Sequence, residues 1–455
     1  MATGAVTTHS PNAARRLWAP RAWMPVAGQP GRGAWQSDVL LEVARDGTWQ
    51  AVHAGAPCPD NAQRLSKPVM PGMVNAHSHA FQRAFVGLAE RRATGSDDFW
   101  SWRDRMYGVA LTITPERLLT VATGLYREML QGGYTHVCEF HYLHHDLDGR
   151  PYAEPATMAL ALVEAACIAG IGLTLLPVVY ERAGFDAPAL RADQRRFAAQ
   201  VPFALRVRDD VRRAAAANVL AGVALHSLRA VAPESVALLQ SLTAGDTGPI
   251  HVHVAEQTGE VEACVAATGL RPVEWLSRHV ALDARWQLVH ATHTTPDEIA
   301  AVAATRAGIV LCPTTEANLG DGLPDLPGWL NAGVPLAIGS DAQMARSWSE
   351  ELRWLEYGQR LMLRRRNVAA SPESGYPSTA ACLVDRSLAG GASAGGFTAW
   401  GLQCGARADL LVIDTDNDAL HGVDPEYLLD ALVFASPARP FAGTMVAGRW
   451  VFEAS

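Results

Sequence analysis

The sequence predicts an α/β fold: a (β/α)8 TIM-like barrel with a smaller β-sandwich domain formed by the N- and C-terminal segments. Two observations support this prediction. In the middle of the chain, eight nearly continuous apolar segments alternate with helical patterns, as in a parallel barrel whose strands are covered on both faces. Both ends instead carry short strand patterns separated by turns. A doubly wound sheet is the alternative, but it would not usually need eight such units in a row.

The two ends of the chain are expected to pair into one composite β-domain. Residues 1–14 are small and polar and are expected to form a flexible tail. In residues 15–68, "DVLLEVARDGTWQAVHAG" predicts two strands joined at an Asp-Gly turn. In residues 392–455, "ADLLVIDTD" and "GTMVAGRWVFE" also predict strands, the second turning at Ala447-Gly448. Each end is too small to fold alone, so the two should combine.

The barrel is expected to occupy residues 69–391. Between its strands lie helical patterns such as residues 114–132, with Thr114 as N-cap, Pro115 in the first turn and Gly132 as the stop. The patterns "APESVALLQSLTAG" and "TTPDEIAAVAATRAG" predict two more helices. The candidate strands are residues 69–79, 134–142, 172–180, 220–227, 249–256, 286–293, 308–315 and 335–341.

The composition predicts a cytoplasmic enzyme that acts on a small molecule. A net charge of −8 without a basic cluster argues against nucleic-acid binding. No apolar run is long enough to span a membrane. The seven cysteines are odd in number and scattered, with no C-x-x-C pair, which indicates reduced thiols and a cytoplasmic location.

Polar side chains gather where the predicted strands end. In a barrel, the carboxyl ends of the strands surround one mouth, and active sites lie there. Histidine is the commonest side-chain ligand of divalent metals, so the accumulation favours a metal centre over a polar strand end near the surface. The residues at these ends are His77, His79, Glu139, His141, Tyr142, His226, His253, Glu256, His290 and Asp341.

A zinc site of three imidazoles and one carboxylate fits this pattern. His77, His79, His253 and Asp341 are the candidate ligands. Such a centre lowers the pKa of a bound water from 15.7 toward about 7 and supplies hydroxide at neutral pH. A two-metal site bridged by a carbamylated lysine is the rival, but the one lysine of the chain, Lys67, precedes the barrel. We therefore expect one Zn²⁺ per subunit, with Fe²⁺ or Mn²⁺ as possible substitutes.

Hydroxide attack also requires a proton carrier. Glu256 lies just past the end of its strand, where it could take a proton from water and give it to a leaving nitrogen. The alternative is that Glu256 merely orients a ligand histidine. His290 could polarise the electrophile or stabilise the tetrahedral intermediate. His251 is expected in the core, and three others, His144, His145 and His293, are expected in loops or beside the ligands.

The motifs "HSH", "HVHVAEQ", "LVHATH" and "GSD" resemble those of the amidohydrolase superfamily, in its branch of mononuclear zinc deaminases, over residues 17–455. The segments "PGMVNAHSHAFQRAFVGLAE", "FWSWRDRMY", "EFHYLHHD", "ALHSLRAV", "CPTTEANLGDG" and "EELRWLEYGQRL" more specifically resemble the formimidoylglutamate deiminases, enzymes of histidine degradation. The resemblance implies zinc on His77, His79, His253 and Asp341, with Glu256, His290 and Asp341 as the catalytic residues.

The resemblance also implies a substrate site lined by Gln82, Arg103, Tyr142, His226 and Arg229. Two arginines at the barrel mouth suit the two carboxylates of N-formimino-L-glutamate, a small dicarboxylate. Hydrolysis of its formimino group would release ammonia and leave N-formyl-L-glutamate. The long segment 81–113 is expected to form a lid or a wall over the site, and the resemblance implies a homodimer.

One departure and two rival functions accompany this interpretation. After "GSD" the family usually continues Ser-His, whereas this chain has Ala342-Gln343, which leaves the substrate range open. A deaminase of the same superfamily acting on a heterocycle is the first rival, although such a ring would call for stacking residues rather than two arginines. A catalytically inactive scaffold barrel is the second, but all the ligand and catalytic positions are present.

Overall fold

The computed structural model describes residues 15–29, 31–92, 97–214, 218–435 and 437–453. The predicted tail at residues 1–14 lies outside the described residues. In the parts of the chain so described, no helix is both long enough and apolar enough to cross a membrane.

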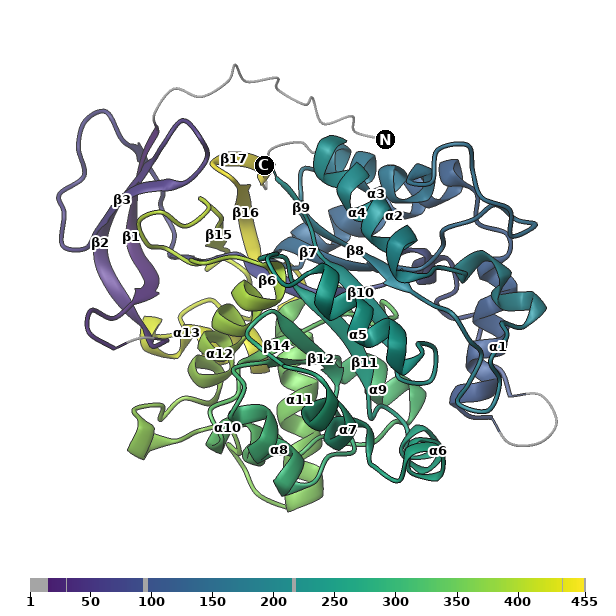
Figure 1. Ribbon diagram of the computed structural model, residues 1–455. Helices are drawn as coiled ribbons and strands as arrows, with labels where there is room; N and C mark the ends of the chain where they lie inside the picture. Colours follow the sequence, from purple (N-terminus) through teal and green to yellow (C-terminus); the bar gives the residue numbers. More distant parts are fainter. Residues whose placement is uncertain (1–14, 30, 93–96, 215–217, 436, 454–455) are drawn as a thin grey trace.

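Eight parallel strands form the barrel predicted for the middle of the chain (Figure 1). Neighbouring strands pair in the order β14-β13-β12-β11-β10-β8-β7-β6. The ring is closed by a parallel bridge between Ser78 and Asp341, with His79 N–H donating to the Asp341 carbonyl. The eight barrel strands are β6 Met73–Ser78, β7 Tyr134–His141, β8 Gly172–Val179, β10 Val223–Ser227, β11 Ile250–Val254, β12 Trp286–His290, β13 Gly308–Leu311 and β14 Leu336–Ile338.

Helices surround the barrel and follow its strands in sequence. The predicted helix at 114–132 is confirmed as α2, with Thr114 accepting a hydrogen bond from Arg117 N–H and Gly132 as the C-cap. The helices are α1 Phe99–Ala110, α2 Pro115–Gln131, α3 Thr157–Ala169, α4 Val201–Ala214, α5 Pro233–Leu242, α6 Thr258–Thr268, α7 Pro272–His279, α8 Pro296–Ala303, α9 Pro313–Leu319, α10 Leu326–Asn331, α11 Trp348–Leu363, α12 Thr379–Gly395 and α13 Leu428–Phe434.

Both chain ends contribute to a second, eight-stranded sheet, which confirms the smaller β-domain. Its order is β17-β16-β15-β5-β1-β2-β3, with β4 beside β1. In Figure 1 the purple strands β1 to β3 lie beside the loops and strands of the yellow end. A separate apolar core, including Leu17, Trp49 and Met445, joins the two ends. The strands are β1 Arg15–Pro25, β2 Gly33–Val43, β3 Trp49–His53, β4 Gln63–Arg64, β5 Val69–Met70, β15 Leu410–Ile413, β16 Phe441–Val446 and β17 Arg449–Glu453.

Two predicted strands differ from the observed ones for local reasons. The segment 308–315 is a strand only to Leu311, because Pro313 begins helix α9. The segment 220–227 is divided into β9 (Val219–Ala221) and β10 at Gly222. A Cβ at Gly222 would lie 2.3 Å from the carbonyl oxygen of Pro249, so only glycine permits this close approach. The domain boundaries at residues 69 and 391 stay predictions.

Candidate metal and catalytic centre

Four predicted metal ligands meet at the carboxyl end of the barrel. His77 lies near the end of β6, His79 follows it, His253 belongs to β11, and Asp341 follows β14. The Nε2 atoms of His77 and His79 lie 3.5 and 3.4 Å from Asp341 Oδ1. The Nε2 atoms of His253 and His77 lie 2.9 Å apart. Donor atoms from three strands therefore gather at this end of the barrel, with His77, His79 and His253 in one compact group and Asp341 beside it.

Hydrogen bonds at the far side of two rings fix their tautomers. His79 Nδ1 lies 2.9 Å from the Phe140 carbonyl oxygen, and His253 Nδ1 lies 2.9 Å from the His226 carbonyl oxygen. Because a carbonyl can only accept, each Nδ1 must carry the proton. The Nε2 lone pairs of His79 and His253 consequently face the centre, as metal ligation requires.

The charge states of this group fit a divalent cation. Burial lowers the pKa of His77 to about 3 and places the pKa of His253 well below its usual value. Burial alone would raise the pKa of Asp341, but the hydrogen bond of His77 and the charge of His290 hold it well below its usual range. Three neutral imidazoles and one carboxylate are a donor set that binds Zn²⁺ or a similar ion. The residues present therefore fit a metal.

Glu256 and His290 lie beside this donor set. His290 Nε2 lies 3.7 Å from Glu256 Oε1 and 3.8 Å from Asp341 Oδ2. Burial raises the pKa of Glu256 to about 7. Burial would lower the pKa of His290, but the carboxylate of Glu256 and the hydrogen bond to Glu316 outweigh it and raise that pKa to about 10. His290 is thus an imidazolium between carboxylates.

Glu316 belongs to the centre and was missed from the sequence. Its Oε1 lies 3.3 Å from His290 Nδ1 and also accepts a hydrogen bond from Cys312 N–H at 2.9 Å. The residue is buried in the short helix α9. The motif "CPTTEANLGDG" contained it, but only the fold shows that this carboxylate orients His290.

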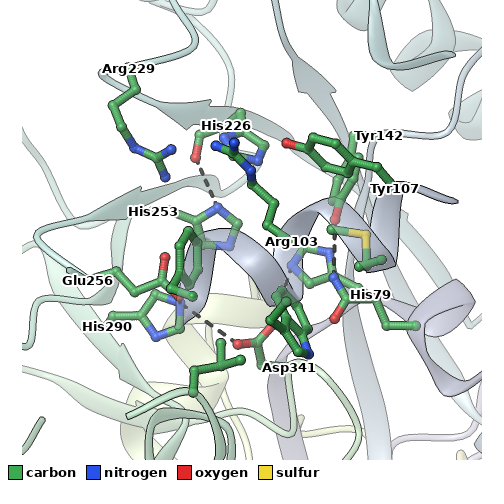
Figure 2. A pocket seen from close by; sticks show the side chains of 15 residues that line it. His79, Arg103, Tyr107, Tyr142, His226, Arg229, His253, Glu256, His290 and Asp341 are labelled. Carbon is green, nitrogen blue, oxygen red and sulfur yellow. Dashed lines mark hydrogen bonds and ion pairs between the residues drawn. The ribbon is translucent and has the colours of Figure 1, made fainter. Parts of the chain in front are cut away.

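Two arginines reach the same pocket from different elements (Figure 2). Arg103 extends from α1, and Arg229 lies in the turn that follows β10. Arg229 is 8 % exposed, and within the described part of the chain it forms no ion pair. The Nε atoms of both residues are buried without a hydrogen-bond partner. Arg103 has one carboxylate partner in the described chain, Asp104 at 3.4 Å, and Arg229 has none within ion-pair distance. Two guanidinium groups with free hydrogen-bonding capacity at one pocket indicate a site for an anionic ligand.

The structure brings the predicted residues together. Gln82 Nε2 donates to the Tyr142 hydroxyl at 3.1 Å. His77 lies beneath the pocket floor and is fully buried. The pocket is lined by the other ten predicted residues: His79, Gln82, Arg103, Tyr142, His226, Arg229, His253, Glu256, His290 and Asp341. Its remaining wall was not predicted and consists of Phe99, Trp102, Met106, Tyr107 and Leu319, four of them from α1.

The four histidines that were expected in the core, in loops or beside the ligands contact backbone carbonyl groups. His251 is fully buried and its Nε2 lies 3.0 Å from the Ala394 carbonyl oxygen, below the site. His144 and His145 contact backbone carbonyls with their Nε2 atoms. His293 does the same with the carbonyl of Asp321 at 2.8 Å. None of these four lines the pocket in the described chain.

A buried hydrogen-bond chain supports the ligands from behind and uses the unusual Gln343. Its Oε1 accepts from Ser340 Oγ at 2.8 Å, and its Nε2 donates to Ser78 Oγ at 3.0 Å. Ser78 in turn donates to Glu139 Oε2 at 2.9 Å. Gln343 thus ties the segment of Asp341 to the strand of His77 where the barrel closes.

The backbone at the centre is strained. Ala255, His290, Ala291, Asp341 and Gln343 all have positive φ angles, between 46° and 70°. Such angles are uncommon for residues with a side chain and cluster at functional sites. Here they turn the chain sharply at strand ends, so that the side chains of His290 and Asp341 face the barrel axis.

Comparisons with known proteins agree with this geometry. The model of the amidohydrolase family matches residues 69–451. The chain is 47 % identical over 422 residues to a formimidoylglutamate deiminase of Pseudomonas aeruginosa, covering 92 % of this chain and 91 % of that protein. Among solved structures, an amidohydrolase from Brucella melitensis matches with a TM-score of 0.89 and 41 % identity over 96 % of this chain and 95 % of that one. An adenosine deaminase from Xanthomonas campestris with bound zinc shares the fold, at a TM-score of 0.76 and 22 % identity over 96 % and 92 % of the two chains.

Proposed function

Because the chain belongs to the amidohydrolase family, we propose that it hydrolyses N-formimino-L-glutamate to N-formyl-L-glutamate and ammonia. The observation that carries this proposal is that one pocket combines a group of metal-binding side chains with two cationic side chains. A metal donor set with a buried carboxyl group lies on one side, and two guanidinium groups, each with a buried Nε that has no hydrogen-bond partner, lie on the other. The identity to the Pseudomonas aeruginosa deiminase supports the choice of substrate.

The proposed cofactor is one Zn²⁺ per subunit, held by His77, His79, His253 and Asp341. The neutral imidazoles and the ionised Asp341 support this assignment, as does the zinc in the Xanthomonas campestris neighbour of the same fold. When bound, zinc lowers the pKa of a coordinated water toward about 7 and so makes hydroxide available.

Glu256 is the proposed proton carrier. Water adds to the formimino carbon, and the Glu256 carboxylate accepts the proton that the water gives up and passes it to the imino nitrogen, which becomes an amino group. Glu256 then moves the proton of the new hydroxyl group to the same nitrogen, the carbon–nitrogen bond breaks, the carbonyl of the formyl group forms, and ammonia leaves. A pKa of about 7 lets one group perform both transfers near neutral pH.

His290 is proposed to stabilise the adduct. Its imidazolium lies beside Glu256 and Asp341, and Glu316 fixes its orientation through Nδ1. A positioned cation next to the reacting carbon offsets the negative charge that develops on the oxygen added from water.

Arg103 and Arg229 are the proposed carboxylate receptors. A guanidinium fork matches a carboxylate with two parallel hydrogen bonds, and two such groups match the two carboxylates of the substrate. Gln82, Tyr142 and His226 complete the proposed contacts around the rest of the molecule.

The decisive experiment measures ammonia release by the zinc-loaded protein from N-formimino-L-glutamate, guanine, cytosine and adenosine. Selective turnover of the formimino acid supports the proposal. Turnover of a ring compound alone would leave the metal chemistry in place and overturn the assignment of the arginines. Absence of turnover on every compound, with metal bound, would favour a scaffold.

The proposal extends to the pathway and the cellular location of the enzyme. The enzyme would act in histidine degradation in the cytoplasm, and the seven cysteines, none of which forms a disulfide, suit a reducing compartment. The homodimer stays a prediction.

A further inference from the structure

Both substrate-binding arginines contact the same aromatic ring. The guanidinium carbon of Arg103 lies 4.7 Å from the ring centroid of Trp100, and that of Arg229 lies 5.4 Å from it. Trp100 precedes Arg103 by one helical turn in α1, whereas Arg229 comes from the opposite wall, after β10. One indole thus links the two halves of the proposed carboxylate receptor.

Apart from Trp100, the guanidinium of Arg103 lies 5.5 Å from the ring centroid of Tyr107. Burial disfavours the charged form of Arg229, but the charges of Glu260 and Glu256 outweigh it and raise its pKa. Within the described chain, the ion pair of Arg103 is with Asp104, at 3.4 Å, and Asp104 is half exposed and shared with Arg191. Arg229 forms no ion pair in that part of the chain. The electron-rich face of tryptophan is the aromatic surface that best attracts a cation, and the attraction grows when the cation is desolvated.

The position of the indole itself is fixed by its surroundings. Phe99 packs edge-on against it with ring centroids 5.0 Å apart. A Cβ at Gly259, in the first turn of α6, would lie 3.7 Å from the indole ring, so this turn faces the ring and leaves space for little more than a methyl group. The backbone N–H of Trp100 also donates to Asp98 at the N-cap of α1. Trp100 does not line the pocket in the described chain, so the ring acts from behind the arginines.

We propose that Trp100 is a positioning residue for carboxylate recognition, which holds the guanidinium groups of Arg103 and Arg229 in place before the substrate binds. This inference rests on the proposed function for its substrate. An arginine side chain has many rotamers, and ordering two of them on binding would weaken affinity. A shared aromatic surface reduces this loss and also separates two like charges at defined positions. Trp100 therefore acts mainly on substrate binding rather than on the chemical step.

The test compares Trp100→Leu, which retains apolar bulk without a π face, with Trp100→Phe, which retains a smaller π face. We expect Trp100→Leu to raise KM for N-formimino-L-glutamate by about tenfold, equivalent to about 1.4 kcal/mol, with kcat nearly unchanged. Trp100→Phe should recover most of the affinity. Trp354→Leu, at a half-exposed position on α11, is the matched control and should leave both constants unchanged.

A binding measurement separates this inference from the proposed reaction. Glutarate carries two carboxylates and no formimino group, and its dissociation constant by calorimetry should rise in parallel with KM in Trp100→Leu. If the parent protein binds glutarate but does not deaminate the formimino acid, the proposed function fails while the role of Trp100 is still tested.

The inference is overturned if Leu and Phe variants bind glutarate as tightly as the parent, or if both lose kcat with unchanged KM. Circular dichroism and metal content establish that each variant is folded and loaded. If the Leu variant does not fold, Trp100→Phe decides alone: its weaker π face should still raise KM measurably, and an unchanged KM overturns the inference.

Discussion

Replacing Arg229 by methionine tests the proposed carboxylate receptor most directly. The substitution keeps an unbranched side chain and removes one buried guanidinium. A bidentate contact comprises two hydrogen bonds to charged groups, each worth about 1.5–3 kcal/mol. Their joint loss, about 3–6 kcal/mol, corresponds to a decrease in kcat/KM of about 10²–10⁴. The rate of ammonia release from N-formimino-L-glutamate, measured at several substrate concentrations, gives this decrease in kcat/KM.

The same substitution should change stability only slightly. Burial disfavours the Arg229 cation, but the charges of Glu260 and Glu256 outweigh this and raise its pKa, while no carboxylate in the described chain pairs with it directly. The melting temperature of Arg229→Met should therefore fall by no more than a few degrees. A large loss of activity with a small change in stability distinguishes a ligand-binding group from a structural one.

Arg366→Met is the control, because Arg366 is exposed and lies in the loop after α11. It should leave kcat/KM and the melting temperature unchanged. A kcat/KM for Arg229→Met within about threefold of the parent would refute carboxylate binding by Arg229. A large fall in its melting temperature would indicate that this guanidinium mainly stabilises the fold.

Three further predictions address the rest of the centre. Glu256→Gln should lower kcat by about 10²–10⁴ while metal content and glutarate binding persist; retention of kcat would exclude Glu256 as the proton carrier. Burial raises the folded-state pKa of Glu139 to about 7, so its stabilising contribution is complete below about pH 4.5 and is lost as the pH rises through 7. Melting curves from pH 4.5 to 8 should therefore show the stability of Glu139→Gln gaining on that of the parent, by about 3 kcal/mol in total, with no further gain above about pH 8; a constant difference across this range would contradict the raised pKa. Removing the metal with a chelator should lower the melting temperature, and zinc at about 1,000 times its dissociation constant should restore about 4 kcal/mol; an unaltered melting temperature would argue against a metal at His77 and His253.

The barrel and the clustering of the candidate ligands could be predicted because their signals are local. The helix α2 is marked by Thr114, Pro115 and Gly132, and the structure begins and ends it at those positions. His77 and His253 stand near the ends of apolar runs, and the barrel topology alone suffices to bring such ends together. Neither step needs knowledge of side-chain packing.

Other features depend on long-range packing and could not be predicted. Nothing adjacent to Glu316 in the sequence indicates that its carboxylate contacts His290 from the next strand unit. The positive φ of Ala291 and Gln343 occurs in residues that rarely adopt it, so the surrounding fold imposes it. The composition of the segment 81–113 suggested a wall over the site, but which face of α1 lines the pocket follows only from its docking against the barrel.

The closure of the barrel between Ser78 and Asp341 also affects how the protein matures. Two of the proposed ligands lie at the beginning of the barrel sequence and the carboxylate at its end, so a nascent chain cannot assemble the full donor set until the eighth strand has left the ribosome. If this donor set holds an ion, complete coordination therefore requires a closed barrel. A fragment ending before Asp341 would lack both the carboxylate and the seam between the first and last strands.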